Sequence, residues 1–542
     1  MAATRVFHNG KIYTVNKQQP WAEAVALEGN KIVYVGSNEE ALKLADAGTQ
    51  VEDLEGKMML PGFIDGHIHP FIAVAFTSGV QLSACRTKEE ILDAVREYVA
   101  ANPDNETYFG QGFDDAILAN LPALADELDA ICADKPMLLV SSSCHGAWCN
   151  HKAFEVAGID KNTPDITPGS NFFVRDEEGN PTGRCIETCY IKVATKANYF
   201  PVEKLIKLLK ELAGDFASLG YTSFADCGCF PFILDMFDDS LVDFLKSDEF
   251  LQRLFGGFYM ATTLENAEAA LESADWLAKN WKSSDRIGFS FFKIVGDGVL
   301  ESRSAAMAHP YDDGTAPVPN FTSDEAKQMG LMVAKAGYDL NMHAIGDATN
   351  TVALDAAEAI RNAGCSDTRI AISHSQCWEA GSVERAGKLG LFINSTGAWH
   401  NSPNQMYKEI VGANIVGFQY PIRSLIDVGC KYGQGSDFPV ADGKPDVFTS
   451  IEVGMRRRSV GDIDSPEPVD LCEAPTLAES IESFTINNAW QVRMEDKLGS
   501  IEVGKLADLV IIDKNLFDVP TEEIHACKVM ETIRDGVTTF KA

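Results

Sequence analysis

Short apolar segments separated by turn residues occupy both ends of the chain. Between Arg5 and about Leu60, β-branched and aromatic residues alternate with Asn-Gly, Glu-Gly and Gly-Asn steps, a pattern typical of small β-sheets. The pattern returns near the C-terminus, where Asp535 and Gly536 suit a tight hairpin turn. Neither end has enough strands for a stable sandwich alone. We therefore predict one composite β-sandwich domain from residues 1–60 and 485–542.

Between these ends, strand-like segments alternate with helical stretches, which predicts repeated β/α units and a parallel sheet. Eight such units favour an α/β fold of the TIM-like (β/α)8 barrel type over residues 61–484 as the catalytic domain. In a barrel of this type the catalytic groups follow the C-terminal ends of the strands. The strands are expected near residues 60–65, 220–226, 253–259, 288–295, 338–343, 369–374, 390–395 and 430–436.

The interval from about Gln81 to Tyr199 is too long for one β/α unit. It contains its own strand-like segments, loops with proline and a hairpin-like RDEEGNPTG. We predict an inserted subdomain, residues 81–199, over the barrel mouth. Long insertions at that face commonly supply substrate contacts or a lid.

Histidines follow several of the predicted strands. His67 and His69 close the first one, and residues two apart in a strand point to one face, so both imidazoles can meet one cation. Such a pair is a weak signal alone. However, His343, His374 and Asp437 end the fifth, sixth and eighth predicted strands, and the chain has only 10 histidines. The sequence therefore predicts a metal centre at the strand ends, whereas Asp65 fits a structural capping role.

Seven stretches carry a resemblance to a known family. Across nearly the whole chain the sequence resembles the YtcJ-like branch of the amidohydrolase superfamily, and the order and spacing of the stretches agree with that family. They are LPGFIDGHIHP (60–70), SCHGAWCNHKAF (143–154), FFKIVGDGVLESRSAA (291–306), MHAIGD (342–347), ISHSQ (372–376), GSDFPV (435–440) and KLGSIEVGKLADLVIID (497–513).

The resemblance implies a centre of one or two divalent metal ions, usually zinc. It places His67 and His69 on the more buried ion and His343 and His374 on the more exposed one. Asp437 would touch metal and activate water, first as general base and then as general acid toward the leaving nitrogen.

Lys293 occupies the family position of a lysine that carbon dioxide can carboxylate. The carbamate so formed would bridge both ions. The segment FSFFKIVGDG puts Lys293 at the end of the fourth predicted strand, where a plain ammonium would repel the metals.

Several further residues are candidates for substrate binding. His145 and Asn150 belong to the family's insertion motif, whereas His151 departs from the family pattern and receives no role. Asp297, Arg303 and Tyr311 follow the fourth strand.

The role of two of these positions stays open. Arg303 could grip a substrate carboxylate or pair with one of the acidic groups of the chain. His400 lies in INSTGAWHNSP, where many relatives carry a Gln-Pro step instead. The sequence therefore does not predict whether His400 faces the pocket or solvent, and the substrate of those relatives cannot be assigned to this chain.

The expected reaction is hydrolysis of a carbon-nitrogen bond in a small molecule, such as an N-acyl, N-formyl or cyclic amide, by metal-bound hydroxide. Hydrolytic deamination and ester or lactone cleavage use the same centre and stay as alternatives. A non-catalytic scaffold is disfavoured because every expected ligand is present.

The charge and composition of the chain limit the kinds of molecule that it is expected to bind. Lys and Arg total 46 and Asp and Glu total 79, a net charge of −33 that repels phosphate backbones and anionic lipids. We expect no nucleic-acid or membrane partner. Without a secretory signal or an apolar run near the roughly 18 residues of a membrane span, a cytoplasmic protein is predicted. A homodimer is compatible with a barrel of this kind.

The 13 cysteines are scattered, and in a cytoplasmic chain they are expected to be reduced. One group has CxxxC and CxC spacings, but no CxxC or His-rich partner completes a zinc set, so metal binding there is disfavoured. The group comprises Cys144, Cys149, Cys185, Cys189, Cys227 and Cys229.

Overall fold

The computed structural model divides into two compact units. Unit 1 consists of Met1–His69, Lys210–Cys229 and Phe244–Ala542, and unit 2 of Pro70–Leu209 and Phe230–Asp243. The structure describes residues 3–118, 124–142, 146–165, 172–194, 196–228, 239–257, 260–261, 263–264, 267–268, 270–272, 283–300, 303–379, 381–401, 419–440, 445–462, 464, 468 and 470–542.

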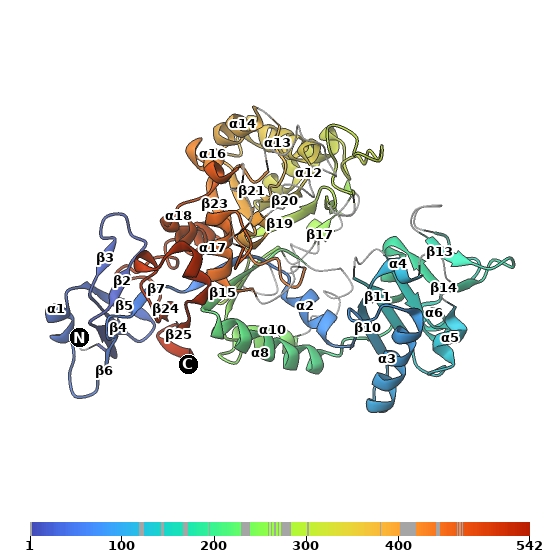
Figure 1. Ribbon diagram of the computed structural model, residues 1–542, viewed down its shortest axis with the longest axis horizontal. Helices are drawn as coiled ribbons and strands as arrows, with labels where there is room; N and C mark the ends of the chain where they lie inside the picture. The colour runs from blue at the N-terminus through green and yellow to red at the C-terminus, as the bar shows by residue number, and fades with distance from the viewer. Residues whose placement is uncertain are drawn as a thin grey trace. The chain divides into compact units, whose positions relative to one another are not determined.

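Strands from both chain ends build two mainly antiparallel sheets in unit 1. The first has the order β5 (Lys31–Gly36), β4 (Ala24–Glu28), β1 (Arg5–His8), β6 (Gln50–Asp53). The second has the order β26 (Val537–Lys541), β25 (Val529–Arg534), β24 (Leu509–Ile512), β7 (Met58–Pro61), β2 (Lys11–Tyr13), β3 (Trp21–Ala22). C-terminal β24 pairs antiparallel with N-terminal β7, as the red and blue strands of Figure 1 show. The predicted composite of both ends is confirmed.

Two parallel sheets form the rest of the strand framework in unit 1. One has the order β18 (Ile287–Phe289), β16 (Arg253–Gly256), β15 (Tyr221–Asp226), β8 (Phe63–Ile68). The other has the order β17 (Met260–Ala261), β19 (Phe291–Val295), β20 (Asp339–Ala344), β21 (Ile370–His374), β22 (Phe392–Ser395), β23 (Lys431–Gln434). The predicted α/β class with a parallel sheet is confirmed, and closure into one barrel stays a prediction.

Two predicted strands are each divided in the structure. Residues 288–295 form β18 and β19 with a break at Ser290, whose amide donates to the carbonyl of Gly256 at 3.0 Å. Beyond this break the chain leaves β16 and pairs with β20. Residues 60–65 divide at Gly62, where an added Cβ would lie 2.4 Å from Thr222. β7, before this glycine, belongs to a composite sheet, and β8, after it, belongs to a parallel sheet.

Helices follow most of the parallel strands, and their ends are set by capping groups. Thr322 and Glu325 form a capping box at the start of α12, which satisfies two backbone amides that the first helical turn leaves free. The helices with residues in unit 1 are α1 (Asn38–Leu42), α8 (Val202–Ser218), α10 (Asp239–Lys246), α12 (Ser323–Lys335), α13 (Asp347–Asn362), α14 (Ser382–Leu389), α16 (Ile422–Asp427), α17 (Val447–Arg456), α18 (Leu477–Ser483) and α19 (Ile486–Gln491), with 3-10 turns at η2 (Gly397–Asn401), η4 (Leu471–Glu473), η5 (Leu516–Asp518) and η6 (Thr521–Ala526). In the part of the chain that the structure describes, no helix combines the length and apolarity that crossing a bilayer requires.

Unit 2 has one mixed sheet and its own apolar core around the fully buried Trp148. The sheet has the order β13 (Phe172–Arg175), β14 (Pro181–Ile186), β12 (Gly146–Cys149), β11 (Met137–Ser141), β10 (Tyr108–Phe113), β9 (Val80–Gln81). Its helices are α2 (Pro70–Thr77), α3 (Lys88–Ala101), α4 (Asp115–Leu118), α5 (Ala125–Asp129), α6 (His151–Ala157), α7 (Ile191–Ala194) and the 3-10 turn η1 (Glu187–Tyr190). The predicted insertion, 81–199, lies within this unit, and its place over a barrel mouth stays a prediction.

Candidate metal centre

Two imidazoles and one carboxylate meet at the ends of β8 and β23. His67 belongs to β8 and His69 follows it, and both are buried. The Nε2 atoms of His67 and His69 lie 3.5 Å and 3.2 Å from Oδ1 of Asp437. One ligand atom from each of the three residues lies within 4.8 Å of the others. This arrangement brings together three of the residues that the sequence predicts as metal ligands.

The backbone around these ligands is strained. Asp437, His374 and Ser375 have φ angles of 54°, 70° and 50°, in the left-handed region that non-glycine residues rarely adopt. Each such residue costs about 1–3 kcal/mol, and such residues cluster at functional sites. The amide of Asp437 donates to the carbonyl of His67 at 2.7 Å, which holds the strained carboxylate beside the imidazoles.

The donor atoms fit a divalent cation. Oδ1 of Asp437 is buried without a hydrogen-bond partner, although it faces two imidazole nitrogens. Burial, reinforced by the charge of Lys293, lowers the pKa of His67 well below its usual value, and burial next to His343 lowers the pKa of His374 likewise. Both rings are therefore neutral, which is the form that binds metal.

Three further predicted ligands surround this group. Nζ of Lys293 lies 3.1 Å from Nε2 of His67, and Nδ1 of His374 lies 3.7 Å from Oδ2 of Asp437. The ring of His343 lies 4.4 Å from that of His374. Burial lowers the pKa of Lys293, so its amine holds a proton less strongly than an exposed lysine does.

His343 is oriented by its second nitrogen. Its Nε2 lies 3.3 Å from both the carbonyl of Gly298 and Oδ1 of Asp297. Because a carbonyl only accepts, Nε2 carries the proton and Nδ1 is the nitrogen left for an ion.

His69 is oriented in a similar way by residues that the sequence analysis did not single out. Its Nδ1 donates to the carbonyl of Gly228 at 2.6 Å, and the amide of Gly228 donates to Oδ1 of Asp226 at 2.7 Å. Burial raises the pKa of Asp226 to about 7. Asp226 lies at the end of the strand predicted at 220–226. Its position at a strand end, like that of the candidate ligands, is the sequence feature that could have identified it.

Asp65 has the structural role that its sequence position suggests. Its Oδ1 accepts hydrogen bonds from the amides of His67 at 3.1 Å and Ser436 at 2.9 Å. This carboxylate therefore joins the segment after β23 to β8.

Asp297 and Arg303 make contacts within the protein. The oxygens of Asp297 accept from the amides of Ala306, Ile345 and Gly346 at 2.8–3.1 Å. Arg303 pairs with Asp312 and Asp313, each at 3.2 Å, the second of the two roles considered for it. The hydroxyl of Tyr311 donates to the carbonyl of Ala305 at 2.7 Å. Substrate contact by Asp297 or Arg303 stays a prediction.

Residues 146–154 of the predicted insertion motif lie in unit 2, whereas residues 143–145, which include His145, lie outside the described residues. Asn150 is buried and caps α6; its Oδ1 accepts from Met137 and Ala153, and its Nδ2 donates to carbonyls of Cys132 and Lys135, all at 2.9–3.0 Å. Its amide is thus fully used within unit 2, and a substrate contact stays a prediction. Exposed His151 pairs with Asp129 at 2.6 Å.

The loop after β22, which departs from the family pattern, places an aromatic ring beside a candidate ligand. Trp399 stacks on His374, with ring centroids 5.7 Å apart and planes at 18°. His400 is buried, 2.9 Å from Oγ of Ser395 and with its ring 4.5 Å from that of Tyr420. His400 therefore faces the protein interior and not solvent.

The cysteine group contains no described disulfide. Sγ of Cys149 lies 3.9 Å from Sγ of Cys185, and both are free thiols, as are Cys189 and Cys227. Cys144 and Cys229 lie outside the described residues.

The chain is similar in sequence to a known family and to several known proteins. The model of the amidohydrolase family matches residues 50–540. The chain is 33% identical over 411 residues to the exoenzymes regulatory protein AepA of Pectobacterium carotovorum, covering 73% of this chain and 86% of that protein. It is 25% identical to the N-substituted formamide deformylase of Arthrobacter pascens, covering 98% and 97%. The Bacillus subtilis protein YtcJ is also 25% identical, covering 99% of each, which confirms the predicted YtcJ-like resemblance.

A solved structure supports the fold. A metal-dependent hydrolase of uncharacterized activity from Pyrococcus horikoshii superimposes with a TM-score of 0.75 at 22% identity, covering 95% of this chain and 99% of that one. The arrangement of strands and helices is therefore one that a metal-dependent hydrolase also uses.

Proposed function

The chain belongs to the amidohydrolase family, and we propose from this premise that it hydrolyses a carbon-nitrogen bond of a small amide, with zinc as the metal. The observation that carries the proposal is the orphaned Oδ1 of Asp437 facing the Nε2 atoms of His67 and His69 in a buried site. Nitrogen and carboxylate ligands of this kind suit zinc.

His67, His69 and Asp437 would hold the first ion, and His343 and His374 a second one. Bound there, a divalent cation supplies Lewis-acid chemistry, which polarises a scissile carbonyl and lowers the pKa of water. The contacts of His69 with Gly228 and of His343 with Gly298 leave Nε2 of His69 and Nδ1 of His343 as the ring nitrogens that would bind an ion.

Asp437 is the proposed proton carrier. Its Oδ1 faces His67 and His69, while Oδ2 lies on the side of His374. Oδ2 would take a proton from water as the bond to the carbonyl carbon forms, and would return it to the nitrogen that leaves. This transfer needs one carboxylate within reach of both groups.

Lys293 is proposed to become carboxylated. Burial lowers its pKa and so favours the neutral amine, which is the form that attacks carbon dioxide. A bond forms between Nζ and the carbon of carbon dioxide, and one proton passes from the nitrogen to solvent water, which leaves a carbamate anion beside His67. The oxygens of this anion would be able to hold divalent ions, which an ammonium group would repel.

The substrate class we favour is an N-substituted formamide. The likeness to the formamide deformylase spans 98% of this chain, and Trp399 offers an aromatic face beside His374 for an apolar substituent on nitrogen. Hydrolysis would yield formate and an amine.

A substrate screen tests this proposal. Zinc-loaded protein is incubated with N-benzyl and N-alkyl formamides, the matching acetamides, cyclic amides, esters and aminated heterocycles, and formate, amine and ammonia are measured. We expect formate and amine in equal amounts from the formamides. Ammonia release from the heterocycles would make the protein a deaminase, and hydrolysis of esters alone would also contradict the proposal. A zinc-loaded protein that turns over none of these compounds would contradict the proposal as well.

A further inference from the structure

The strands that lead to the candidate ligands belong to different sheets. β8 is an edge strand of one parallel sheet and β23 an edge strand of the other, and in the described chain no ladder of backbone hydrogen bonds pairs them. Beyond the strand ends, two backbone bonds join the segments: Asp437 to the carbonyl of His67, and His69 to the carbonyl of Phe438 at 2.9 Å. The two strands themselves need another connection.

That connection is a side chain from α19. The amide nitrogen of Asn488, which is fully buried, donates to the carbonyl of Ile64 in β8 and to the carbonyl of Gln434 in β23, each at 2.7 Å. Both acceptors are carbonyls, so only the NH2 group can face them. One side chain thus replaces the hydrogen bonds that a strand pair would make.

The strands leave space for this amide. A Cβ added at Gly66 in β8 would lie 2.5 Å from Oδ1 of Asn488, and one added at Gly433 in β23 would lie 2.4 Å from the same atom. Any larger residue at either position would displace the side chain. A second amide, that of Gln491, donates to the carbonyl of Gly66 at 3.1 Å.

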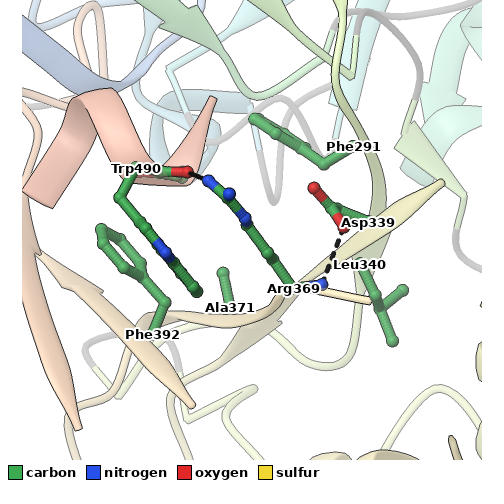
Figure 2. A pocket seen from close by; sticks show the side chains of 8 residues that line it. Phe291, Asp339, Leu340, Arg369, Ala371, Phe392 and Trp490 are labelled. Atoms are coloured by element: carbon green, nitrogen blue, oxygen red, sulfur yellow. Dashed lines mark hydrogen bonds between the residues drawn. The ribbon is translucent and has the colours of Figure 1, made fainter. Parts of the chain in front are cut away.

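Contacts of Trp490 hold helix α19 in place beside the strands. Figure 2 shows Trp490 between Phe392 and Arg369, with its ring stacked on Phe392 at 5.8 Å and the Arg369 guanidinium 4.4 Å from the centre of its ring. Arg369 also donates to the carbonyl of Trp490, and its amide bonds to Asp339 at 2.7 Å. The cavity here is only about 10 Å³, enough for one water at most. This end of the strands is packed.

We propose that Asn488 is a positioning residue that fixes the spacing between the strand carrying His67 and the strand leading to Asp437, and thereby sets the zinc affinity of the centre. The inference rests on the proposed function, because it needs those residues to be ligands. Partners that orient metal ligands from outside the coordination shell are typically worth about 10–100-fold in affinity.

The test replaces Asn488 in the full-length protein and measures zinc affinity by chelator competition, together with the visible absorption of the cobalt-substituted protein. The matched control is Asn487→Ala, because in the described chain the side-chain hydrogen bond of Asn487 goes to the carbonyl of Tyr432 in β23, at 2.8 Å, and not to β8. Asn488→Ser retains one donor and carries the test if Asn488→Ala does not fold. Thermal unfolding is recorded for each metal-free variant.

We expect Asn488→Ala to lose about 10-fold or more in zinc affinity and to alter the cobalt spectrum, while Asn487→Ala keeps both. An Asn488 variant with the affinity and spectrum of the parent would overturn the inference, as would an Asn487→Ala protein that loses as much. A parent protein that binds no zinc would instead be a failure of the proposed function.

Discussion

The imidazole of His69 donates from Nδ1 to the carbonyl of Gly228 at 2.6 Å, which leaves Nε2 to face Asp437 at 3.2 Å. A hydrogen bond of this kind fixes both the tautomer and the angle of a ligating histidine. Asp226 holds the turn that presents this carbonyl, because its Oδ1 accepts a hydrogen bond from the amide of Gly228. Asp226 thus helps to orient a candidate metal ligand through the backbone of Gly228.

This relationship predicts opposite outcomes for two variants of Asp226. Asp226→Ala removes the acceptor for Gly228 and should weaken zinc binding about 10–100-fold. Asp226→Asn keeps an oxygen at that place and should stay close to the parent. Chelator competition measures both constants. Equal zinc affinity in the alanine variant and the parent would show that the Gly228 turn holds itself.

Asp437→Asn keeps the shape of the side chain but removes its basic oxygen. Because general acid-base assistance is worth about 100-fold to 10,000-fold in rate, kcat should fall by that range while the variant stays folded. Steady-state kinetics with the best substrate of the screen, at measured zinc content, checks the prediction. Asp518→Asn, at the exposed end of η5, is the control and should leave kcat unchanged. A zinc-loaded Asp437→Asn protein with most of its kcat would assign the proton transfer to another group.

Carboxylation of Lys293 should make metal loading depend on carbon dioxide. Zinc added in buffer freed of carbon dioxide should give the parent protein less bound metal and less activity than zinc added with bicarbonate. Lys293→Ala should bind less metal under both conditions and should not respond to bicarbonate. Isotope-labelled carbon dioxide followed by NMR would show the carbamate directly. Full loading of the parent without carbon dioxide would contradict the bridge and favour a single-ion centre.

Glu531 links the two chain ends within the composite sheets, because it pairs with Arg5 of β1 from its place in β25. Burial alone would raise the pKa of Glu531, but the hydrogen bonds from Thr538 and Arg5 outweigh it and lower the pKa. The pair therefore stabilises the folded protein above the usual glutamate pKa of about 4.3, and this contribution is lost as the pH falls through the lower folded value.

Glu531→Gln should accordingly cost about 1–3 kcal/mol near neutral pH and progressively less below about pH 4. Urea unfolding at several pH values measures the difference. Glu52→Gln is the matched control, because Glu52 pairs with the same arginine from a more exposed position. A loss for Glu531→Gln that does not change with pH would show that packing, and not charge, is responsible.

Local sequence patterns predicted the strand ends that carry the ligands. His343 and His374 lie at the ends of β20 and β21 as expected. These strands could be predicted because the local pattern of apolar residues shows where each strand lies and which residue comes at its end. The break at Ser290 was missed because β18 and β19 read as one apolar run, and only their different neighbours separate them.

Contacts between distant parts of the chain could not be predicted in this way. Asn488 bonds Ile64 across 424 positions, and nothing in its local sequence distinguishes it from a helix-surface amide. Asn150 belongs to a family motif, yet its four bonds show a helix cap, a role that depends on the backbone of Cys132 and Lys135. Residue type and spacing identified the candidate ligands, whereas the groups that orient them depend on contacts that only the three-dimensional structure shows.

The central claim is that His67, His69 and Asp437 hold a divalent metal ion, and the metal content of the purified protein tests it most directly. Inductively coupled plasma mass spectrometry on protein purified without chelators should find one or two zinc ions or similar divalent ions per chain. The His69→Ala variant should contain markedly less metal. A metal-free parent protein that hydrolyses its substrate at full rate in the presence of a chelator would contradict the account.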